Sequence, residues 1–244
     1  MRTTEHPDRS TDTDGSVHAV LVPGYWLGAW AWSEVEAALV DAGINSHALT
    51  LPGLDGDPTT GLGMRDHVDT VVAAVRNLDG EVVLVGHSGG GPVVQCVVDR
   101  IPDRIKRVIY VDTGPLVAGV ALRPDATEDI DLPSWDELAE QQASIEGLDE
   151  AALERFRRLA VPQPAGVAAS PIDVTDDRRF DVPATVVCTS LPSAVLLQMI
   201  EQGQMPSELP QILDVAYIDL PTGHWPMFSR PDDLAEIIAG EARR

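Results

Sequence analysis

The chain is poor in cysteine and has no long apolar run, and each shortage excludes a class of protein. Its 244 residues contain only two cysteines, Cys96 and Cys188, each inside an apolar segment. Free buried thiols in a reducing cytoplasm fit this usage better than a disulfide does. No stretch reaches the ~18 apolar residues that a membrane span needs, and residues 1–16 lack the apolar core of a secretory signal. We therefore expect a cytoplasmic protein with a disordered tail at residues 1–16 and no membrane partner.

Positive charge is also scarce. There are 17 basic and 39 acidic side chains, a formal net charge of −22, and Lys106 is the only lysine. An acidic surface of this kind repels nucleic acid and anionic membranes, so neither is expected as a partner. None of the six histidines has an H-x-x-x-H or comparable spacing to another, so zinc is not expected either. We predict no metal and no cofactor.

The chain does contain a regular alternation of strand-like and helix-like segments. Its length and its 44% hydrophobic residues suffice for one large α/β domain. The apolar strand runs are residues 17–22, 45–51, 82–85, 108–111, 185–188 and 215–220, and helical spacing is found at 30–42, 64–78, 92–100, 194–201 and 231–242. This alternation predicts a mostly parallel sheet with helices on both faces, and such sheets bind ligands at the carboxyl ends of their strands.

Residues 113–182 interrupt the alternation. They contain no convincing strand, are rich in acidic side chains, and hold two short helical patterns. The first pattern begins with a capping box at Ser134, and the second runs from Asp149 to Ala160. Connections of this length are uncommon in compact domains unless they are functional. We expect a helical lid inserted into one core, which consists of residues 17–112 and 183–244.

The segment from Gly86 to Gly90 contains the pattern G-x-S-x-G, directly after a strand run and before a helical pattern. This context describes a nucleophile elbow, a tight turn that strains the serine backbone and exposes its hydroxyl at the carboxyl end of the strand. The helix that follows offers the backbone N–H of Gly89 to a developing oxyanion. Ser88 is therefore the candidate nucleophile of a serine hydrolase.

A serine nucleophile needs a neighbouring base, usually histidine, that a third group orients. His224 lies on the loop between the last expected strand and the final helix, from which it can reach Ser88. The alternative for His224 is a hydrogen bond within its own turn. His87 lies inside the elbow, where packing is more common than reaction. The remaining histidines belong to the tail or to early strands and helices, and we expect them to be structural: His6, His18, His47 and His67.

With these motifs the sequence resembles the α/β-hydrolase superfamily, and the resemblance covers nearly all of the chain after residue 16. The segment Leu21 to Trp30 is similar to the oxyanion loop of small esterases related to plant methylesterases and hydroxynitrile lyases, with Pro23-Gly24 where that group usually has His-Gly. The resemblance implies that the backbone N–H of Tyr25 is the first oxyanion donor, beside that of Gly89. Simple core packing is the alternative for Tyr25 and Trp26.

The resemblance also implies an acid between Ser88 and His224 in the chain. In most of the superfamily it follows the strand that is 185–188 here, but residues 189–193 contain no carboxylate. Some branches carry the acid one strand earlier, where this chain has Asp112. We therefore predict Asp112 as the triad acid, with capping of the turn into the lid as the alternative. Asp219 is the fallback, although it lies within an expected strand.

A triad of Ser88, His224 and Asp112 predicts cleavage of a small, largely apolar carboxylic ester or lactone through an acyl-enzyme. No cluster of arginines indicates a clamp for an anionic substrate. Apolar residues of the lid and of the oxyanion loop are candidates for substrate binding, with ordinary packing between lid and core as the alternative. These candidates are Trp26, Trp135, Leu138 and Phe156.

Two other functions stay open at this stage. One is a different reaction on the same triad: cofactor-free perhydrolysis, C–C bond hydrolysis or cyanohydrin cleavage. Hydroxynitrile lyases of this type usually add a lysine near the site, whereas Lys106 lies at the start of a strand. The other is a non-catalytic member of the fold that binds a small molecule. Neither the acyl group, the alcohol nor the oligomeric state follows from the sequence, which has no heptad or repeat.

Overall fold

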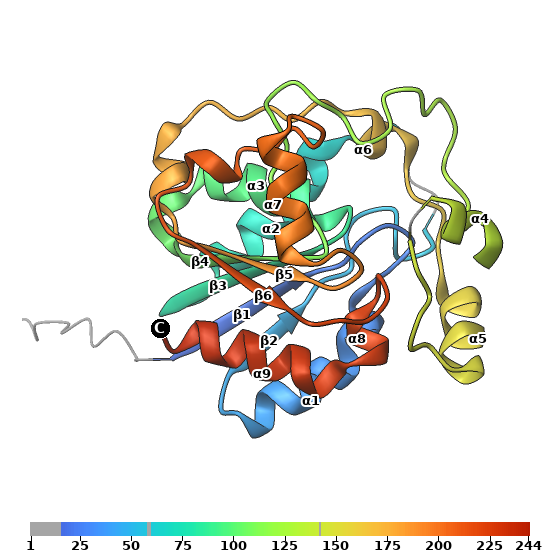
Figure 1. The fold of residues 1–244 in the computed structure, drawn as a ribbon, viewed down its shortest axis with the longest axis horizontal. Coiled ribbons are helices and arrows are strands. Elements are labelled where there is room, and N and C mark those ends of the chain that lie inside the picture. Colours follow the sequence, from blue (N-terminus) through green and yellow to red (C-terminus); the bar gives the residue numbers. More distant parts are fainter. Residues whose placement is uncertain (1–15, 58–59, 142) are drawn as a thin grey trace, which may run out of the picture.

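A computed structural model of the chain describes residues 16–57, 60–141 and 143–244 (Figure 1). The expected tail at residues 1–16 lies outside them, apart from Ser16. At the centre of the described residues is one parallel sheet with the strand order β2-β1-β3-β4-β5-β6. The strands are β1 (Val17–Val22), β2 (Asn45–Ala48), β3 (Glu81–His87), β4 (Ile105–Val111), β5 (Ala184–Cys188) and β6 (Val215–Asp219).

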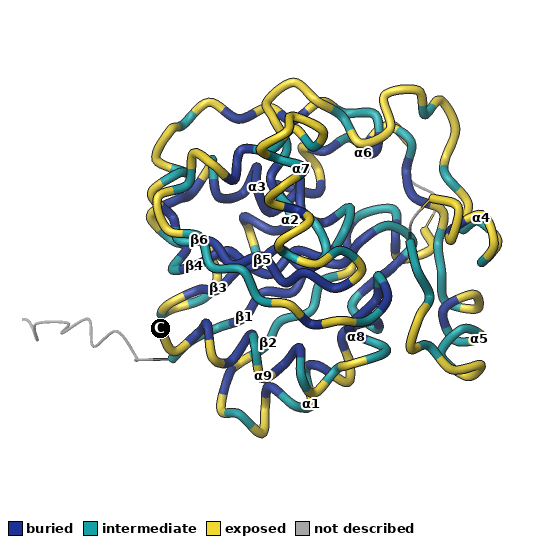
Figure 2. Tube along the Cα trace, viewed as in Figure 1, coloured by how far each residue is buried: buried dark blue, intermediate teal, exposed yellow. Residues whose placement is uncertain are grey.

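The four inner strands are buried on both faces, which explains why they appear in the sequence as continuous apolar runs. In β1, Val20 and Val22 pack into the core on one face of the sheet, while Ala19 and Leu21 pack into the core on the other. Figure 2 shows the inner strands as the buried centre of the fold. The predicted parallel sheet is therefore confirmed. The second strand ends at Ala48 rather than Leu51, because the chain leaves the edge of the sheet there.

Helices cover both faces of the sheet (Figure 1). One layer contains η1 (Ala29–Trp32), α1 (Ser33–Asp41), α8 (Pro226–Ser229) and α9 (Pro231–Ala242), and the other contains α2 (Met64–Arg76), α3 (Gly90–Arg100) and α7 (Ser193–Glu201). Outside the insertion, the described residues contain two further short 3-10 helices, η2 (Pro102–Arg104) and η4 (Leu209–Gln211). No helix of the described residues is long and apolar enough to span a membrane. Both cysteines are buried and free, as expected.

The insertion at residues 113–182 contains α4 (Trp135–Glu140), α5 (Glu150–Leu159), α6 (Ala165–Ala169) and η3 (Asp177–Asp181). The capping box is present: Ser134 Oγ accepts from the Glu137 N–H, and Glu137 Oε2 accepts from the Ser134 N–H. The sequence did not predict α6 or η3, because elements of five residues are too short to show a helical period. Its only β pairing among described residues is the isolated bridge of Ile130 to Gln163. Its action as a lid stays a prediction.

Candidate active site

The turn between β3 and α3 has the geometry expected of a nucleophile elbow. Ser88 has a φ of +47°, a left-handed conformation that non-glycine residues rarely adopt. The glycines two positions before and after it have no room for side chains. A Cβ on Gly86 would lie 2.6 Å from Val94 Cγ2, and a Cβ on Gly90 would lie 2.6 Å from Pro23 O. The glycines therefore allow a turn so tight that the Ser88 hydroxyl projects from the end of the strand.

Three side chains that are far apart in the sequence form one chain of hydrogen bonds at this end of the sheet. His224 Nε2 lies 2.8 Å from Ser88 Oγ, and His224 Nδ1 lies 2.6 Å from Asp112 Oδ2. Ser88 and Asp112 each follow one of two neighbouring strands, and the Ser88 N–H donates to Val111 O at 3.1 Å. His224 reaches them from the loop after β6. The arrangement is that of a nucleophile, a base and an orienting acid.

Four donors surround the carboxylate of Asp112. Oδ1 accepts from the backbone N–H groups of Thr189 and Ser190, at 3.2 and 3.1 Å. Oδ2 accepts from Ser190 Oγ at 2.6 Å and from His224. Burial by itself raises the pKa of Asp112, but the hydrogen bonds from His224, Ser190 and Thr189 outweigh it and hold this pKa well below its usual range. A charged Asp112 keeps the imidazole proton on Nδ1, so that Nε2 of His224 is free to accept the proton of Ser88.

Ser190 is a member of this site that the sequence did not reveal. In the sequence, residues 189–193 are distinguished only by the absence of the carboxylate that most of the superfamily has there. In the structure the same turn donates three hydrogen bonds to the acid on the neighbouring strand. The signal in the sequence was a small hydroxyl residue at the end of β5, which is too common to be diagnostic.

The contacts do not support the two alternative assignments, which are Asp219 as the acid and Asp112 as a cap of the turn into the insertion. Asp219 Oδ1 accepts from the Ser193 N–H at 2.7 Å and its Oδ2 accepts from Ser193 Oγ at 2.9 Å, so this carboxylate caps the start of α7. Within the described residues, no hydrogen bond of the Asp112 side chain goes to the turn that leads into the insertion. It therefore does not cap that turn.

His87 supports the loop that carries His224. Its Nε2 donates to the backbone oxygen of His224 at 2.7 Å, and the two rings lie 5.0 Å apart. Burial, with a smaller contribution from the charge of His224, lowers the pKa of His87 to about 3. His87 is thus a neutral packing residue, in agreement with the sequence. Of the other histidines, His67 is buried and bonds to Pro52 O, and His18 and His47 bond to each other.

The connection between α4 and α5 also positions the His224 loop. The backbone N–H of His224 donates to Ser144 O at 2.7 Å, and that of Gly223 donates to Glu146 O at 3.1 Å. A Cβ on Gly223 would lie 2.5 Å from Ser144 O, so the two backbones approach as closely as they can. The insertion therefore contacts the candidate base directly, a link that no sequence pattern indicated.

The two expected oxyanion donors lie beside Ser88. A Cβ on Gly24 would be 3.0 Å from Ser88 Cβ, and one on Gly89 would collide with the ring of Tyr25. Among the described residues, neither the Tyr25 N–H nor the Gly89 N–H donates to another group. Gly89 is also the N-cap of α3, whose first N–H groups point toward this end of the sheet. Both donors are thus available, and their role in binding an oxyanion stays a prediction.

The four expected substrate-binding residues all pack in or against the hydrophobic core on the α1 and α9 side of the sheet. Phe156 and Leu138 are 0% and 1% exposed, and Phe156 packs against the rings of Trp135, Trp225 and others. The Trp26 indole N–H donates to Ile130 O at 2.8 Å, which ties the oxyanion loop to the insertion. These contacts agree with packing between lid and core, and substrate binding by the four residues stays a prediction.

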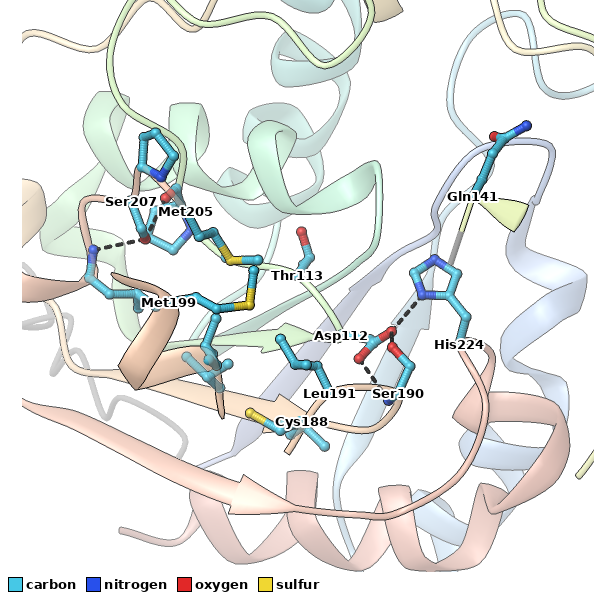
Figure 3. Close-up of a pocket in the computed structure, with 17 residues that line it drawn as sticks. Asp112, Thr113, Gln141, Cys188, Ser190, Leu191, Met199, Met205, Ser207 and His224 are labelled. Atoms are coloured by element: carbon cyan, nitrogen blue, oxygen red, sulfur yellow. Dashed lines mark hydrogen bonds and ion pairs between the residues drawn. The ribbon is translucent and has the colours of Figure 1, made fainter. Parts of the chain in front are cut away.

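A cavity of about 630 Å³ adjoins the His224–Asp112 pair instead (Figure 3). Its walls come from the turn after β4, from β5 and the turn after it, from α7 and the segment after it, and from Gln141 just after α4 and His224 on its loop. Because these pieces lie far apart in the sequence, no local pattern could reveal it. The lining residues are Asp112, Thr113, Gly114, Pro115, Gln141, Val186, Val187, Cys188, Ser190, Leu191, Leu196, Met199, Met205, Pro206, Ser207, Leu209 and His224.

The cavity has no cationic side chain in its lining, and the described residues contain no metal-binding cluster. No arginine or lysine lines the cavity, and Lys106 pairs with Glu81 at the opposite end of the strands, with a distance of 2.6 Å from Nζ to Oε2. Within the described ranges, no three His, Cys, Asp or Glu side chains are grouped so that they could hold a metal ion. The position of Lys106 does not favour a lyase that needs a lysine beside the triad.

Comparisons with known proteins address the fold and the family of this chain. A family model described as "Alpha/beta hydrolase family" matches residues 19–237. The carbendazim hydrolyzing esterase of Nocardioides sp. (strain SG-4G) is 31% identical over 90% of this chain and 97% of its own length. Methylesterase 8 of Arabidopsis thaliana is 35% identical over 38% of this chain and 36% of its own length. A solved pyrethroid hydrolase from Sphingobium faniae JZ-2 shares the fold, with a TM-score of 0.68, 24% identity, and coverage of 93% of this chain and 98% of that one.

Proposed function

The chain belongs to the alpha/beta hydrolase family and is a carboxylic ester hydrolase by its relationship to esterases; we propose that it cleaves a small, largely apolar ester or lactone with a Ser88–His224–Asp112 triad. The observation that carries this proposal is the unbroken hydrogen-bond chain from the Ser88 hydroxyl through His224 to Asp112. The strained backbone of Ser88 at the end of β3 supports its role as nucleophile.

The first half of the reaction forms an acyl-enzyme. As Ser88 Oγ attacks the carbonyl carbon of the ester, its proton passes to His224 Nε2, and Asp112 stabilises the resulting imidazolium. The carbonyl oxygen becomes an oxyanion that accepts hydrogen bonds from the N–H groups of Tyr25 and Gly89. Each such donor contributes on the order of 10²–10³ in rate. The tetrahedral intermediate then collapses, the bond to the alcohol oxygen breaks, and His224 gives the proton to that oxygen.

The second half removes the acyl group. Water occupies the place of the departed alcohol, and His224 Nε2 takes one of its protons as the oxygen attacks the acyl carbon. Collapse of the second intermediate breaks the bond to Ser88 Oγ, which receives the proton from His224. The products are one acid and one alcohol from an ester, or a single hydroxy acid from a lactone, and no cofactor takes part in any step.

The charge of the site supports an uncharged substrate. The cavity wall contains one charged side chain, Asp112, whose charge its four donors compensate. A chain with a net charge of −22 repels anionic substrates as well as nucleic acid. The proposal retains a cytoplasmic location, which the two free and buried thiols support.

Turnover of p-nitrophenyl acetate, butyrate and octanoate by the natural protein and by Ser88→Ala tests the proposal. We expect hydrolysis by the natural protein, no detectable turnover by Ser88→Ala, and covalent labelling of Ser88 by a fluorophosphonate that peptide mass spectrometry locates. Absence of both turnover and labelling in a folded natural protein would refute the proposal and would favour a non-catalytic binding protein on the same fold.

A further inference from the structure

The cavity beside the His224–Asp112 pair has the chemistry of a site for an uncharged apolar group. Met199 and Met205 form the wall of the cavity away from Asp112, and Cys188 lies closer to Asp112 (Figure 3). Burial raises the pKa of the Cys188 thiol to about 12, so that this sulfur stays protonated and neutral. Methionine side chains adapt to the shape of an apolar ligand. A volume of about 630 Å³ lies within the range of small-molecule sites.

The position of the cavity determines which half of an ester it can take. Its lining includes His224 but neither Ser88 nor the expected oxyanion donors, Tyr25 and Gly89. During ester cleavage the carbonyl oxygen faces the N–H donors, whereas the oxygen of the leaving alcohol must reach the histidine that protonates it. A cavity bordered by His224 and not by those donors therefore lies on the side of the alcohol.

A second cavity, which contacts the two expected oxyanion donors, is far smaller. The cavity that contacts Tyr25 and Gly89 has a volume of about 10 Å³, room for about one water molecule. Its walls include Leu51, Leu54 and the buried ring of His67. A cavity of this volume has no room for an acyl chain.

From this asymmetry we propose that the substrate is an ester of a short acid with a bulkier, uncharged and apolar alcohol, and that the cavity of about 630 Å³ binds the alcohol. The alcohol is an aryl or medium-chain alkyl group, because the wall offers methionine, leucine and valine side chains and no cation. This inference rests on the proposed ester hydrolysis and specifies which half of the ester is large.

Pairs of isomeric esters test this inference, since they exchange the sizes of the two halves while keeping the same atoms. One pair is hexyl acetate and ethyl hexanoate, and a second is benzyl acetate and methyl phenylacetate. We expect kcat/KM of the natural protein to favour the acetates by about 10- to 200-fold, since each methylene that enters an apolar cavity contributes about fourfold and hexyl has four more than ethyl. Release of acid, followed by pH-stat titration, measures all four esters in the same way.

Two tryptophan substitutions on α7 provide a matched comparison. Met199→Trp fills the cavity, and we expect it to lower the ratio of kcat/KM for hexyl acetate to that for ethyl acetate by about tenfold. Leu197→Trp adds the same side chain two residues away, at a position that is 37% exposed and outside the lining, and leaves the ratio unchanged. Should Met199→Trp not fold, Met199→Ala enlarges the cavity and raises the ratio for 2-naphthyl acetate over ethyl acetate.

Different experimental results would overturn this inference and the proposed function. Equal kcat/KM for the isomers, or a ratio that Met199→Trp and Met199→Ala do not change, would overturn the inference while Ser88-dependent hydrolysis persisted. If no ester were hydrolysed and Ser88 resisted the fluorophosphonate, the proposed function would fall and this inference with it.

Discussion

Replacing Asp112 by asparagine tests the least conventional part of the site, an acid that follows β4 rather than β5. Two backbone N–H groups, of Thr189 and Ser190, donate to Oδ1, so the amide oxygen of the asparagine would take that position. The amide NH₂ would then replace Oδ2 and face His224 Nδ1, which lies 2.6 Å from Oδ2 in the natural protein. Two donors cannot face each other, so His224 would shift its proton to Nε2 and could no longer accept the proton of Ser88.

The expected loss in kcat/KM for p-nitrophenyl acetate is about 10⁴-fold, or ~5.4 kcal/mol of transition-state stabilisation. The rate of labelling by a fluorophosphonate should fall in parallel, because it depends on the same activated serine. Thermal unfolding checks that the variant is folded. The control is Asp219→Asn, which keeps an oxygen acceptor for the Ser193 N–H at the start of α7 and should change kcat/KM by less than about threefold.

Retention of more than about a tenth of the natural kcat/KM by a folded Asp112→Asn would refute the tautomer argument, since a misplaced proton leaves no efficient base. Loss of activity in Asp219→Asn with little change in Asp112→Asn would reassign the acid to the end of β6.

Three further predictions follow from contacts at and around the site. Ser190→Ala removes one short hydrogen bond to a buried carboxylate and should lower kcat/KM by about tenfold, whereas Ser190→Thr, which keeps the hydroxyl, should restore it; equal activity of the two variants would contradict this role. Phe156→Ala should reduce the free energy of unfolding by about 3–5 kcal/mol with little change in KM; a raised KM with unchanged stability in urea would instead indicate substrate contact. Because His87 has a pKa of about 3 when folded and an ordinary value of 6.5, the unfolded chain binds an extra proton between these pH values. The contribution of the neutral His87 to the free energy of unfolding is complete above pH 6.5. It declines as pH falls toward 3, by at most about 1.4 kcal/mol per pH unit. In His87→Gln, which keeps a donor for His224 O, urea titrations at pH 7, 6 and 5 should show a shallower decline, and identical slopes in the two proteins would argue against it.

The insertion has two structural tasks in this protein. Its aromatic cluster around Phe156 belongs to the core of the α1 and α9 layer, and its segment from Ser144 to Glu146 holds the loop of His224. Both contacts connect the stability of the insertion to the geometry of the base. Substitutions in α4 and α5 are therefore expected to act on turnover through the position of His224 rather than through direct contact with the substrate.

The order of strands and helices, the elbow at Ser88 and the loop of His224 could all be predicted from the sequence. Each depends on a local property: a buried parallel strand is a continuous apolar run, and a tight turn needs glycines at defined positions. Element ends were less predictable, as at Ala48, because they depend on where the chain leaves its neighbour.

The remaining features depend on contacts between segments that are distant in the chain. The sequence showed that residues 189–193 lack an acid, but only the pairing of β4 with β5 places the Ser190 hydroxyl and two backbone N–H groups against Asp112. The same limit applies to Trp135 and Phe156. An apolar side chain is recognisable by its type, but whether it faces a ligand or another ring depends on which segments pack together. The sequence alone thus determined the candidate nucleophile, the candidate base and the fold, while the tertiary structure decided what holds the acid and where the cavity lies.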